Sequence, residues 1–246
     1  MKICGICGFN WDDKKLVKEM ASMMSHRGPD QDGCYTDKNV SLGHRRLSII
    51  DLSKKGKQPM TNEDGTIWIT FNGEIYNFKQ IRDDLEKKGH RFRSDTDTEV
   101  IIHAYEEYGE GCLSLFNGMF AFAIWDSNNR RFFLARDRLG IKPLFYYLKD
   151  GKFAFASEMK SILQIPDVNK EVNYNAINYY LSFFYIPAPM TIFFDVNKLL
   201  PGHFIIFDDN GIRIKKYWDV VFKKTNKPDD YYIDNIVNIM KESVSK

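Results

Sequence analysis

Short runs of alternating apolar and polar residues, separated by polar turns, recur along the chain. This pattern predicts β-strands, arranged as hairpins in 116–136, 145–156 and 203–218 and as single strands at 3–9, 40–50 and 66–71. After the last of these strands, Asn72-Gly73 is typical of a hairpin turn. The helix-like stretch that follows favours a tight turn at a strand end instead.

Apolar residues at helical spacing predict a second set of elements. Amphipathic helices are expected from residue 12 to the mid-twenties and at 79–88, 97–108, 174–184 and 233–244. The first should stop at His26-Arg27-Gly28-Pro29-Asp30, where glycine and proline follow basic residues. Thr96 and Glu99 fit a capping box, which by itself explains the polar run before the third helix.

Composition narrows the class of protein. The chain has 246 residues, enough for one large domain or two modest ones. Its aromatic content of 15% favours packed sheets over a helical bundle. A net charge of +2 gives no reason to expect nucleic acid or a membrane surface as a partner. Four cysteines without framework spacing, and no leader or membrane-spanning run, favour a cytoplasmic protein.

The strongest candidate for chemistry is the amino-terminal run Cys4-Gly5-Ile6-Cys7-Gly8. A cysteine at the amino terminus can use its own α-amine as a base, but only after Met1-Lys2-Ile3 is removed. Two alternatives stay open from the residues alone. Both cysteines could lie in a buried first strand. They could also form a zinc or redox pair, although no second cysteine or histidine pair follows at ligand spacing.

Three further sites carry candidate polar groups. Arg45 and Arg46 should point to opposite faces of their strand, so that one of them reaches a cleft where a guanidinium can hold a carboxylate. The alternative is an edge strand whose arginine faces water. Asn72 beside Gly73 can supply two donors to an oxyanion. Asp97 either favours the helix dipole or binds a substrate ammonium.

Six motifs in series give a resemblance to a known family. They are Cys4 to Gly8, His26 to Asp30, Arg46-Leu47-Ser48-Ile49, Phe71 to Asn77, Ser94 to Glu99 and Arg136 to Leu144. Over residues 4–220 the chain resembles the amino-terminal glutaminase half of glutamine-hydrolysing asparagine synthetases. That half is a class II glutamine amidotransferase of the N-terminal-nucleophile hydrolases. The resemblance implies an α+β fold, a four-layer α-β-β-α sandwich of two antiparallel sheets flanked by helices.

The resemblance also implies roles. Cys4 matches the nucleophile, and the Asn72 side chain with the Gly73 N–H matches the oxyanion hole. Glutamine would be bound by Arg46 at its α-carboxylate, by Glu74 and Asp97 at its α-ammonium, and by the backbone of Leu47, Ser48, Ile49 and Ile50. His26 to Asp30 should shape the site. No metal or organic cofactor is expected in this domain.

Two departures from the family define the alternatives. Lys2 and Ile3 separate the cysteine from the initiator methionine, so a non-catalytic interaction module with Cys4 left capped is the second hypothesis. The Ser-Gly-Gly pyrophosphate loop of the synthetase half is also absent. Residues 221–246 are therefore expected to be a linker and the first helix of a truncated synthetase domain. In the full protein that domain would use ATP and Mg²⁺ and be the partner of the glutaminase domain. A homodimer is a further expected partner arrangement.

Overall fold

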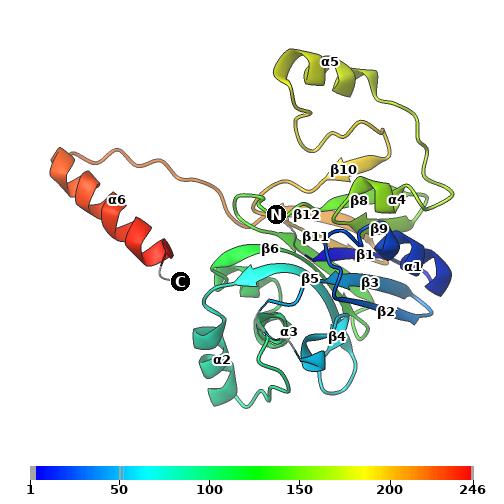
Figure 1. Ribbon diagram of the computed structural model, residues 1–246, viewed down its shortest axis with the longest axis horizontal. Coiled ribbons are helices and arrows are strands. Elements are labelled where there is room, and N and C mark those ends of the chain that lie inside the picture. The colour runs from blue at the N-terminus through cyan, green and yellow to red at the C-terminus, as the bar shows by residue number, and fades with distance from the viewer. Residues whose placement is uncertain (1–3, 50, 52, 245–246) are drawn as a thin grey trace.

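Two antiparallel sheets lie face to face with helices on their outer sides (Figure 1). The structure is a computed structural model that describes residues 4–49, 51 and 53–244. The first sheet has the strand order β10 (Val196–Lys198), β8 (Phe145–Lys149), β9 (Lys152–Ala156), β1 (Gly5–Phe9), β3 (Val40–Arg46), β2 (Gln31–Asp37). The second has the order β12 (Gly211–Lys216), β11 (His203–Asp208), β7 (Arg131–Arg136), β6 (Gly118–Asp126), β5 (Ile67–Ile75), β4 (Met60–Thr61).

Helices cover the outer face of each sheet. The first sheet carries α1 (Lys14–Ser22) and α4 (Met159–Ile162), and the second carries α2 (Phe78–Lys87) and α3 (Asp97–Tyr108). Two further helices, α5 (Tyr174–Phe183) and α6 (Asp229–Val244), stand away from this body (Figure 1). Two short 3-10 helices, η1 (Lys54–Gly56) and η2 (Gly109–Ser114), complete the described elements.

Three apolar layers hold the sandwich together. The central layer joins the two sheets: Ile6 and Leu42 of the first sheet pack with Ala123 and Leu134 of the second. The outer layers lie under α1 and α4 on one side and under α2 and α3 on the other. Burial of these side chains is the main stabilising contribution, at roughly 25 cal/mol per Å² of apolar surface. The expected four-layer α-β-β-α sandwich is confirmed.

The three predicted hairpins are confirmed as β6–β7, β8–β9 and β11–β12. The turn between β8 and β9 shows why the sequence signal was clear. Asp150 and Gly151 both have positive φ, 49° and 75°, which glycine adopts without strain and aspartate tolerates.

The first helix ends earlier than predicted. Asp13 caps α1 by accepting a hydrogen bond from the Leu16 N–H at 2.9 Å, but the helix stops at Ser22 and gives way to turns. Gly28 is therefore not a helix cap. A Cβ at this position would lie 2.3 Å from the Arg45 carbonyl, so the glycine is needed because two backbones approach closely.

The predicted turn at Asn72-Gly73 is wrong. Strand β5 runs through both residues to Ile75 and pairs with β6 along its whole length, with Gly73 opposite Phe120. Tertiary pairing overrides the local turn signal here. Strand β2 was missed, because its sequence QDGCYTD has few apolar residues and lies at a half-exposed sheet edge.

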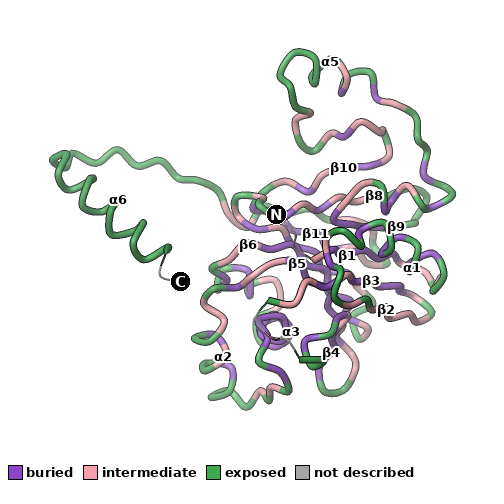
Figure 2. The backbone as a smooth tube through the Cα atoms, in the orientation of Figure 1, coloured by how far each residue is buried: buried purple, intermediate pink, exposed green. Residues whose placement is uncertain are grey.

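The chain leaves the sandwich after β12. All described residues from 219 to 244 are exposed, including the whole of α6 (Figure 2). The boundary near residue 220 remains a prediction, although burial ends there. None of the described helices is long and apolar enough to cross a membrane.

Candidate active site

A pocket opens at the seam where the two sheets and the start of α3 meet. Its walls come from the beginning of β1, the end of β3, the segment after β3, the end of β5 and the first turn of α3. The lining residues are Cys4, Arg46, Leu47, Ile49, Asp51, Gly56, Gln58, Phe71, Gly73, Glu74, Thr96, Asp97 and Thr98.

Cys4 places its thiol in this pocket, directly before β1. The Leu47 N–H points at Sγ from 3.3 Å, and the thiol donates in turn to the Leu47 carbonyl at 3.6 Å. Burial raises the pKa of the Cys4 thiol, while the Leu47 N–H and the charge of Arg46 act in the opposite direction. The thiol is thus held by one backbone unit and needs a base before it can act as a nucleophile.

Arg46 is the inward member of the arginine pair, as the strand alternation predicted. Its guanidinium donates to the Gln31 side chain at 3.0 Å and to the backbone carbonyls of Ser53 and Asp51. All three acceptors are neutral, and no carboxylate in the described chain forms an ion pair with this cation. Three of the roughly five guanidinium donors are used. One terminal N–H and the Nε–H are left for a ligand.

Gly56 makes room for that guanidinium. A Cβ on Gly56 would lie 2.2 Å from Nη2 of Arg46. The 3-10 turn that ends at this glycine therefore fits closely over the arginine and fixes its position in the pocket wall.

Two acids occupy the opposite end of the pocket. Asp97 accepts a hydrogen bond from the Ile75 N–H at 2.9 Å, and burial together with the charge of Glu74 raises the pKa of Asp97 to about 7. The side chain of Glu74 has no hydrogen bond or ion pair with any residue that the structure describes; burial raises its pKa, and the charge of Lys142 opposes this. Two carboxylates that no cation of the described chain contacts directly form a site that favours an incoming ammonium.

Asn72 and Gly73 lie side by side on β5. Gly73 lines the pocket, whereas Asn72 is fully buried next to it and is not part of the wall. Both side-chain polar atoms of Asn72 lack a hydrogen-bond partner in the described chain. A buried amide without partners is costly, by roughly 1–3 kcal/mol per group, and such groups are typically kept for a ligand.

The segment from His26 to Asp30 supports the pocket from outside. Arg27 donates from Nε to the Cys4 carbonyl at 3.1 Å and from Nη1 to Glu158 at 3.0 Å. Asp30 accepts from the Ser48 N–H at 2.8 Å. These bonds fix the residues on either side of the thiol, in line with the expected shaping role.

The structure thus brings together seven of the ten residues expected at the site. They are Cys4, Arg46, Leu47, Ile49, Gly73, Glu74 and Asp97. Ser48 and Asn72 lie beside the pocket but not in its wall, and Ile50 is outside the described residues. The segment Met1–Ile3, on which the activation of Cys4 depends, is also outside them.

Two residues that contribute to the site were missed. Gln58 accepts from the Phe71 N–H at 2.7 Å and donates to Thr98 at 3.2 Å, and so ties β5 to α3. Lys142 is 1% exposed, and its ammonium lacks a hydrogen-bond partner in the described chain. Burial lowers the pKa of Lys142, and the charges of Glu74 and Asp137 oppose this. No local signal marked Gln58, while Lys142 lies in a motif that the sequence had already singled out.

The zinc or redox interpretation of Cys4 and Cys7 is wrong. Cys7 is fully buried in the layer under α1, with Sγ 3.9 Å from the Val17 carbonyl, whereas Cys4 faces the pocket. The two thiols lie on different sides of the sheet, so they can neither share a metal ion nor form a disulfide. All four cysteines are free.

The chain combines a four-layer α-β-β-α sandwich with a pocket cysteine directly before the central strand β1. Residues 2–218 match the model of the glutamine amidotransferase domain family. The chain belongs to this family.

Individual relatives agree with the family. The chain is 42% identical over 235 residues to asparagine synthetase [glutamine-hydrolyzing] 1 of Bacillus subtilis, covering 95% of this chain and 37% of the relative. It is 36% identical over 253 residues to asparagine synthetase [glutamine-hydrolyzing] 3 of the same organism, covering 99% of this chain and 41% of the relative. The chain therefore spans less than half the length of these relatives.

A solved structure shares the fold. It is titled as the structure of the allosteric regulatory enzyme of purine biosynthesis, and it superposes with a TM-score of 0.67 at 18% identity. The superposition covers 89% of this chain and 50% of that one.

Proposed function

We propose that this domain hydrolyses the side-chain amide of L-glutamine to glutamate and ammonia through a thioester on Cys4. One observation carries the proposal. A single pocket holds a thiol, an arginine without an ion-paired acid and two acids that form no ion pair with any described residue. A free amino acid has one carboxylate and one ammonium, so it complements this arrangement, and its side chain can reach the thiol.

Binding follows from the charges at the pocket walls. The α-carboxylate of glutamine accepts the remaining donors of Arg46, and its α-ammonium lies between Glu74 and Asp97. Both contacts exchange water for charge-assisted hydrogen bonds in a partly buried site. The partly exposed stretch of backbone from Leu47 to Ile49 closes the side of the pocket next to the thiol.

The chemistry then needs a nucleophile, a proton carrier and donors for the oxyanion. The Cys4 thiolate attacks the amide carbon, and the carbonyl oxygen becomes an oxyanion held by the Gly73 N–H and the Asn72 amide. The α-amine of Cys4 takes the thiol proton and returns it to the leaving nitrogen, which departs as ammonia. Water then cleaves the thioester to glutamate. The hydrolysis as proposed uses no metal and no organic cofactor.

The base in this scheme depends on processing. While Ile3 precedes Cys4, the nitrogen of Cys4 is an amide and cannot accept a proton. Removal of Met1–Ile3 converts it to an amine with a pKa of about 7.7–8.0, which is partly neutral at neutral pH.

The ammonia is proposed to supply a synthetase domain in a longer protein. The matched relatives are named as glutamine-hydrolysing asparagine synthetases and are more than twice as long as the matched region. In such a protein the second domain would use ATP and Mg²⁺ to make asparagine.

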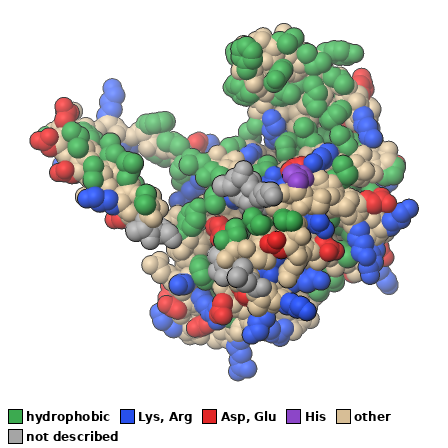
Figure 3. Space-filling model, viewed as in Figure 1, with side chains coloured by type: hydrophobic (Ala, Val, Ile, Leu, Met, Phe, Trp, Pro, Cys, Tyr) green, Lys and Arg blue, Asp and Glu red, His purple; other side chains and the backbone are tan. Residues whose placement is uncertain are grey.

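Two exposed apolar surfaces support a further domain or a second copy of the chain as partner. α6 exposes Ile233, Ile236 and Met240, and α5 exposes Leu181 and Phe183 (Figure 3). Free cysteines support a cytoplasmic location.

The test begins with the intact mass and amino-terminal sequence of the purified protein. If the chain begins at Cys4, glutamine hydrolysis is expected, and Cys4→Ala should abolish it. Cys34→Ala is the matched control, because Cys34 is a free thiol away from the pocket and its loss should leave the rate unchanged.

The non-catalytic module is the competing outcome. A chain that begins at Cys4, binds glutamine and releases no ammonia would contradict the hydrolase proposal. If the chain still carries Met1–Ile3, a variant cleaved by an added protease directly before Cys4 must gain activity. No gain on cleavage would favour the capped module.

A further inference from the structure

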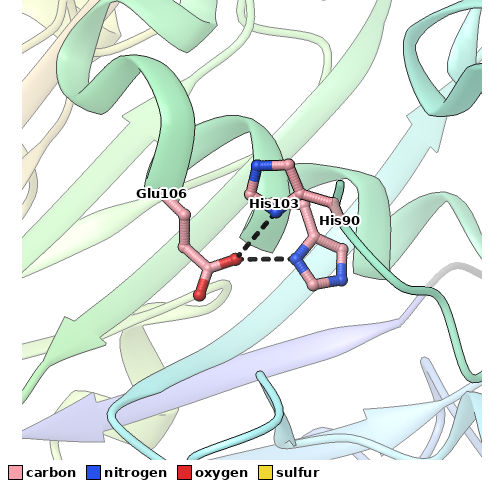
Figure 4. A group of neighbouring side chains, drawn as sticks. All are labelled: His90, His103 and Glu106. Atoms are coloured by element: carbon pink, nitrogen blue, oxygen red, sulfur yellow. Dashed lines mark hydrogen bonds and ion pairs between the residues drawn. The ribbon is translucent and has the colours of Figure 1, made fainter. Parts of the chain in front are cut away.

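A second cluster of polar side chains lies at the outer helical layer, apart from the pocket. His103 and Glu106 are one turn apart on α3, and His90 lies in the segment between α2 and α3 (Figure 4). One ligand atom from each of the three lies within 4.8 Å of the others. We propose that His90, His103 and Glu106 form a binding site for a divalent transition metal ion, with zinc as the best match.

The distances suit a small ion after slight adjustment. Oε2 of Glu106 is 2.6 Å from Nδ1 of His103 and 3.6 Å from Nδ1 of His90. Ligands about 2.0–2.1 Å from a tetrahedral zinc ion are separated by roughly 3.3 Å. The two separations from Glu106 lie on either side of this value, and the ligand atoms of the two histidines lie within 4.8 Å of each other. Binding therefore requires the ion to replace the proton between His103 and Glu106 and a small rotation of each side chain.

The surroundings of the three side chains support a metal more strongly than the distances do. Imidazoles that bind metals usually donate their second N–H to a carboxylate, and coordinating carboxylates are themselves hydrogen-bonded. Here Nε2 of His90 lies 3.4 Å from Glu107, and Nε2 of His103 lies 3.9 Å from Glu99. The second oxygen of Glu106 accepts from Asn62 at 2.7 Å. His90 and Glu106 thus already have outer partners of the kind that orient a metal ligand, and for His103 the Glu99 carboxylate lies just beyond hydrogen-bond range.

One nitrogen of the cluster lacks a hydrogen bond to any of the described residues. Nε2 of His103 is buried and makes no hydrogen bond within the described chain. A metal ion on Nδ1 would fix the tautomer with the proton on Nε2, and a small shift would bring that proton to Glu99. The side chains of His90 and Glu106 are 18% and 21% exposed, so an ion can enter from solvent and keep a water as fourth ligand.

No sequence pattern indicated this site, because His90 and His103 do not stand at ligand spacing and only the fold brings them together. Its role would be structural. The ion would tie the segment after α2 to α3, and Glu99 next to it accepts from the Arg93 and Ser94 N–H groups at 2.8 and 2.7 Å. That segment leads into Asp97, so the ion would brace the turn that carries one pocket acid. This proposal does not depend on glutamine hydrolysis.

The test is a Co²⁺ titration of chelator-treated Cys4→Ala protein, in which the pocket thiol cannot compete. We expect one equivalent to bind, with visible d–d bands typical of four-coordinate cobalt and no thiolate charge-transfer band. Zn²⁺ should displace the cobalt and raise the melting temperature. His90→Gln and Glu106→Gln should each weaken binding by at least about tenfold.

His26→Gln is the matched control, since His26 is an exposed histidine paired with a glutamate outside the cluster, and it should bind cobalt normally. Both test variants alter partly exposed side chains and avoid the buried His103, whose loss could unfold the protein. Failure to bind one equivalent, a thiolate band, or binding that survives His90→Gln would each overturn the proposal. None of these results bears on glutamine hydrolysis, because the assay uses protein without the nucleophile.

Discussion

At the residue scale, Asp97 gives the pocket a pH dependence near neutrality. Because its pKa is about 7 in the free protein, the carboxylate is half protonated at that pH, and only the ionised form attracts the ammonium of glutamine. Between pH 8 and pH 6 the ionised fraction falls about tenfold. Glutamine affinity, measured by calorimetry on Cys4→Ala protein, should therefore weaken about tenfold over this range.

Two variants separate Asp97 from its neighbour in that experiment. Asp97→Asn should bind weakly with a flat profile. Glu74→Gln should keep the slope but shift its midpoint to lower pH, because the charge of Glu74 helps to raise the pKa of Asp97. An unchanged profile in Asp97→Asn would show that another group controls binding.

The raised pKa of Asp97 also makes the stability of the fold depend on pH. The folded pKa lies above the unfolded value, so ionised Asp97 destabilises the fold at high pH, and Asp97→Asn should be more stable at pH 8 but not at pH 3.

Lys142 is expected to reduce the stability of the fold and to strengthen glutamine binding. Its ammonium is buried without a hydrogen-bond partner in the described chain, which costs free energy, yet its charge lowers the pKa of Glu74 against the effect of burial. Lys142→Met should raise the free energy of unfolding by about 1–3 kcal/mol. It should also weaken glutamine binding near pH 6, and less so at pH 8.

Lys198→Met is the control for this pair of measurements. Lys198 is also partly buried, but it donates to the Ile186 carbonyl at 3.0 Å and its charge does not act on Glu74. The Lys198→Met protein should be less stable than the wild type and should keep normal glutamine affinity. A Lys142→Met protein that is less stable than the wild type, with normal binding, would argue that the lysine has a purely structural role.

At the scale of elements, the close pairing of β5 and β6 determines where the oxyanion donors lie. A Cβ on Gly73 would lie 2.3 Å from the Met119 carbonyl, which is too close for any side chain. Gly73→Ala should therefore push the strands apart and reduce the free energy of unfolding by about 1–3 kcal/mol, as measured by urea denaturation. Glutamine hydrolysis by processed protein should fall with it.

Gly111→Ala serves as the matched control. This glycine has no positive φ, and the nearest atom to its Cβ would be 3.9 Å away, so the change should be close to neutral. A Gly73→Ala protein as stable as this control would show that the two strands separate at little cost.

The same two strands show what the sequence could and could not predict. Alternation and turn residues located the hairpins, because both signals are local. The turn predicted at Asn72-Gly73 was wrong, since the extended conformation of these residues comes from pairing with β6, a partner nearly fifty residues away along the chain. Arg46, Gly73 and Asp97 were candidates from their local residues, and the motif resemblance added their roles and further pocket residues. Gln58 and the histidine cluster were not predicted, because no local pattern records which distant segments the fold brings into contact.

At the scale of the whole molecule, the sandwich should be independent of the segment that follows it. No described residue beyond 218 is buried, whereas Tyr217 still donates to the Arg136 carbonyl at 2.9 Å. A chain ending at Val220 should keep its melting temperature within about 2 °C. A chain ending at Asn210 lacks β12, which pairs with β11 along six residues, and should melt at a clearly lower temperature.

A drop of more than about 5 °C in the chain ending at Val220 would show that α6 packs on the sandwich. The apolar residues of α6 would then be part of this domain's own core. The predicted boundary at residue 220 would have to move toward the carboxyl end.

The pocket takes its thiol and arginine from one sheet and its two acids from the other sheet and α3. These four groups come from separate elements, and the segment after β3 adds Leu47 and Ile49 to the pocket wall. Any motion that slides one sheet over the other separates the nucleophile from the groups that hold the substrate. Changes confined to the outer helices α1, α2 and α4 or to the edge strands can therefore leave the chemistry intact, whereas the relative position of the two sheets and α3 has to be kept as one unit.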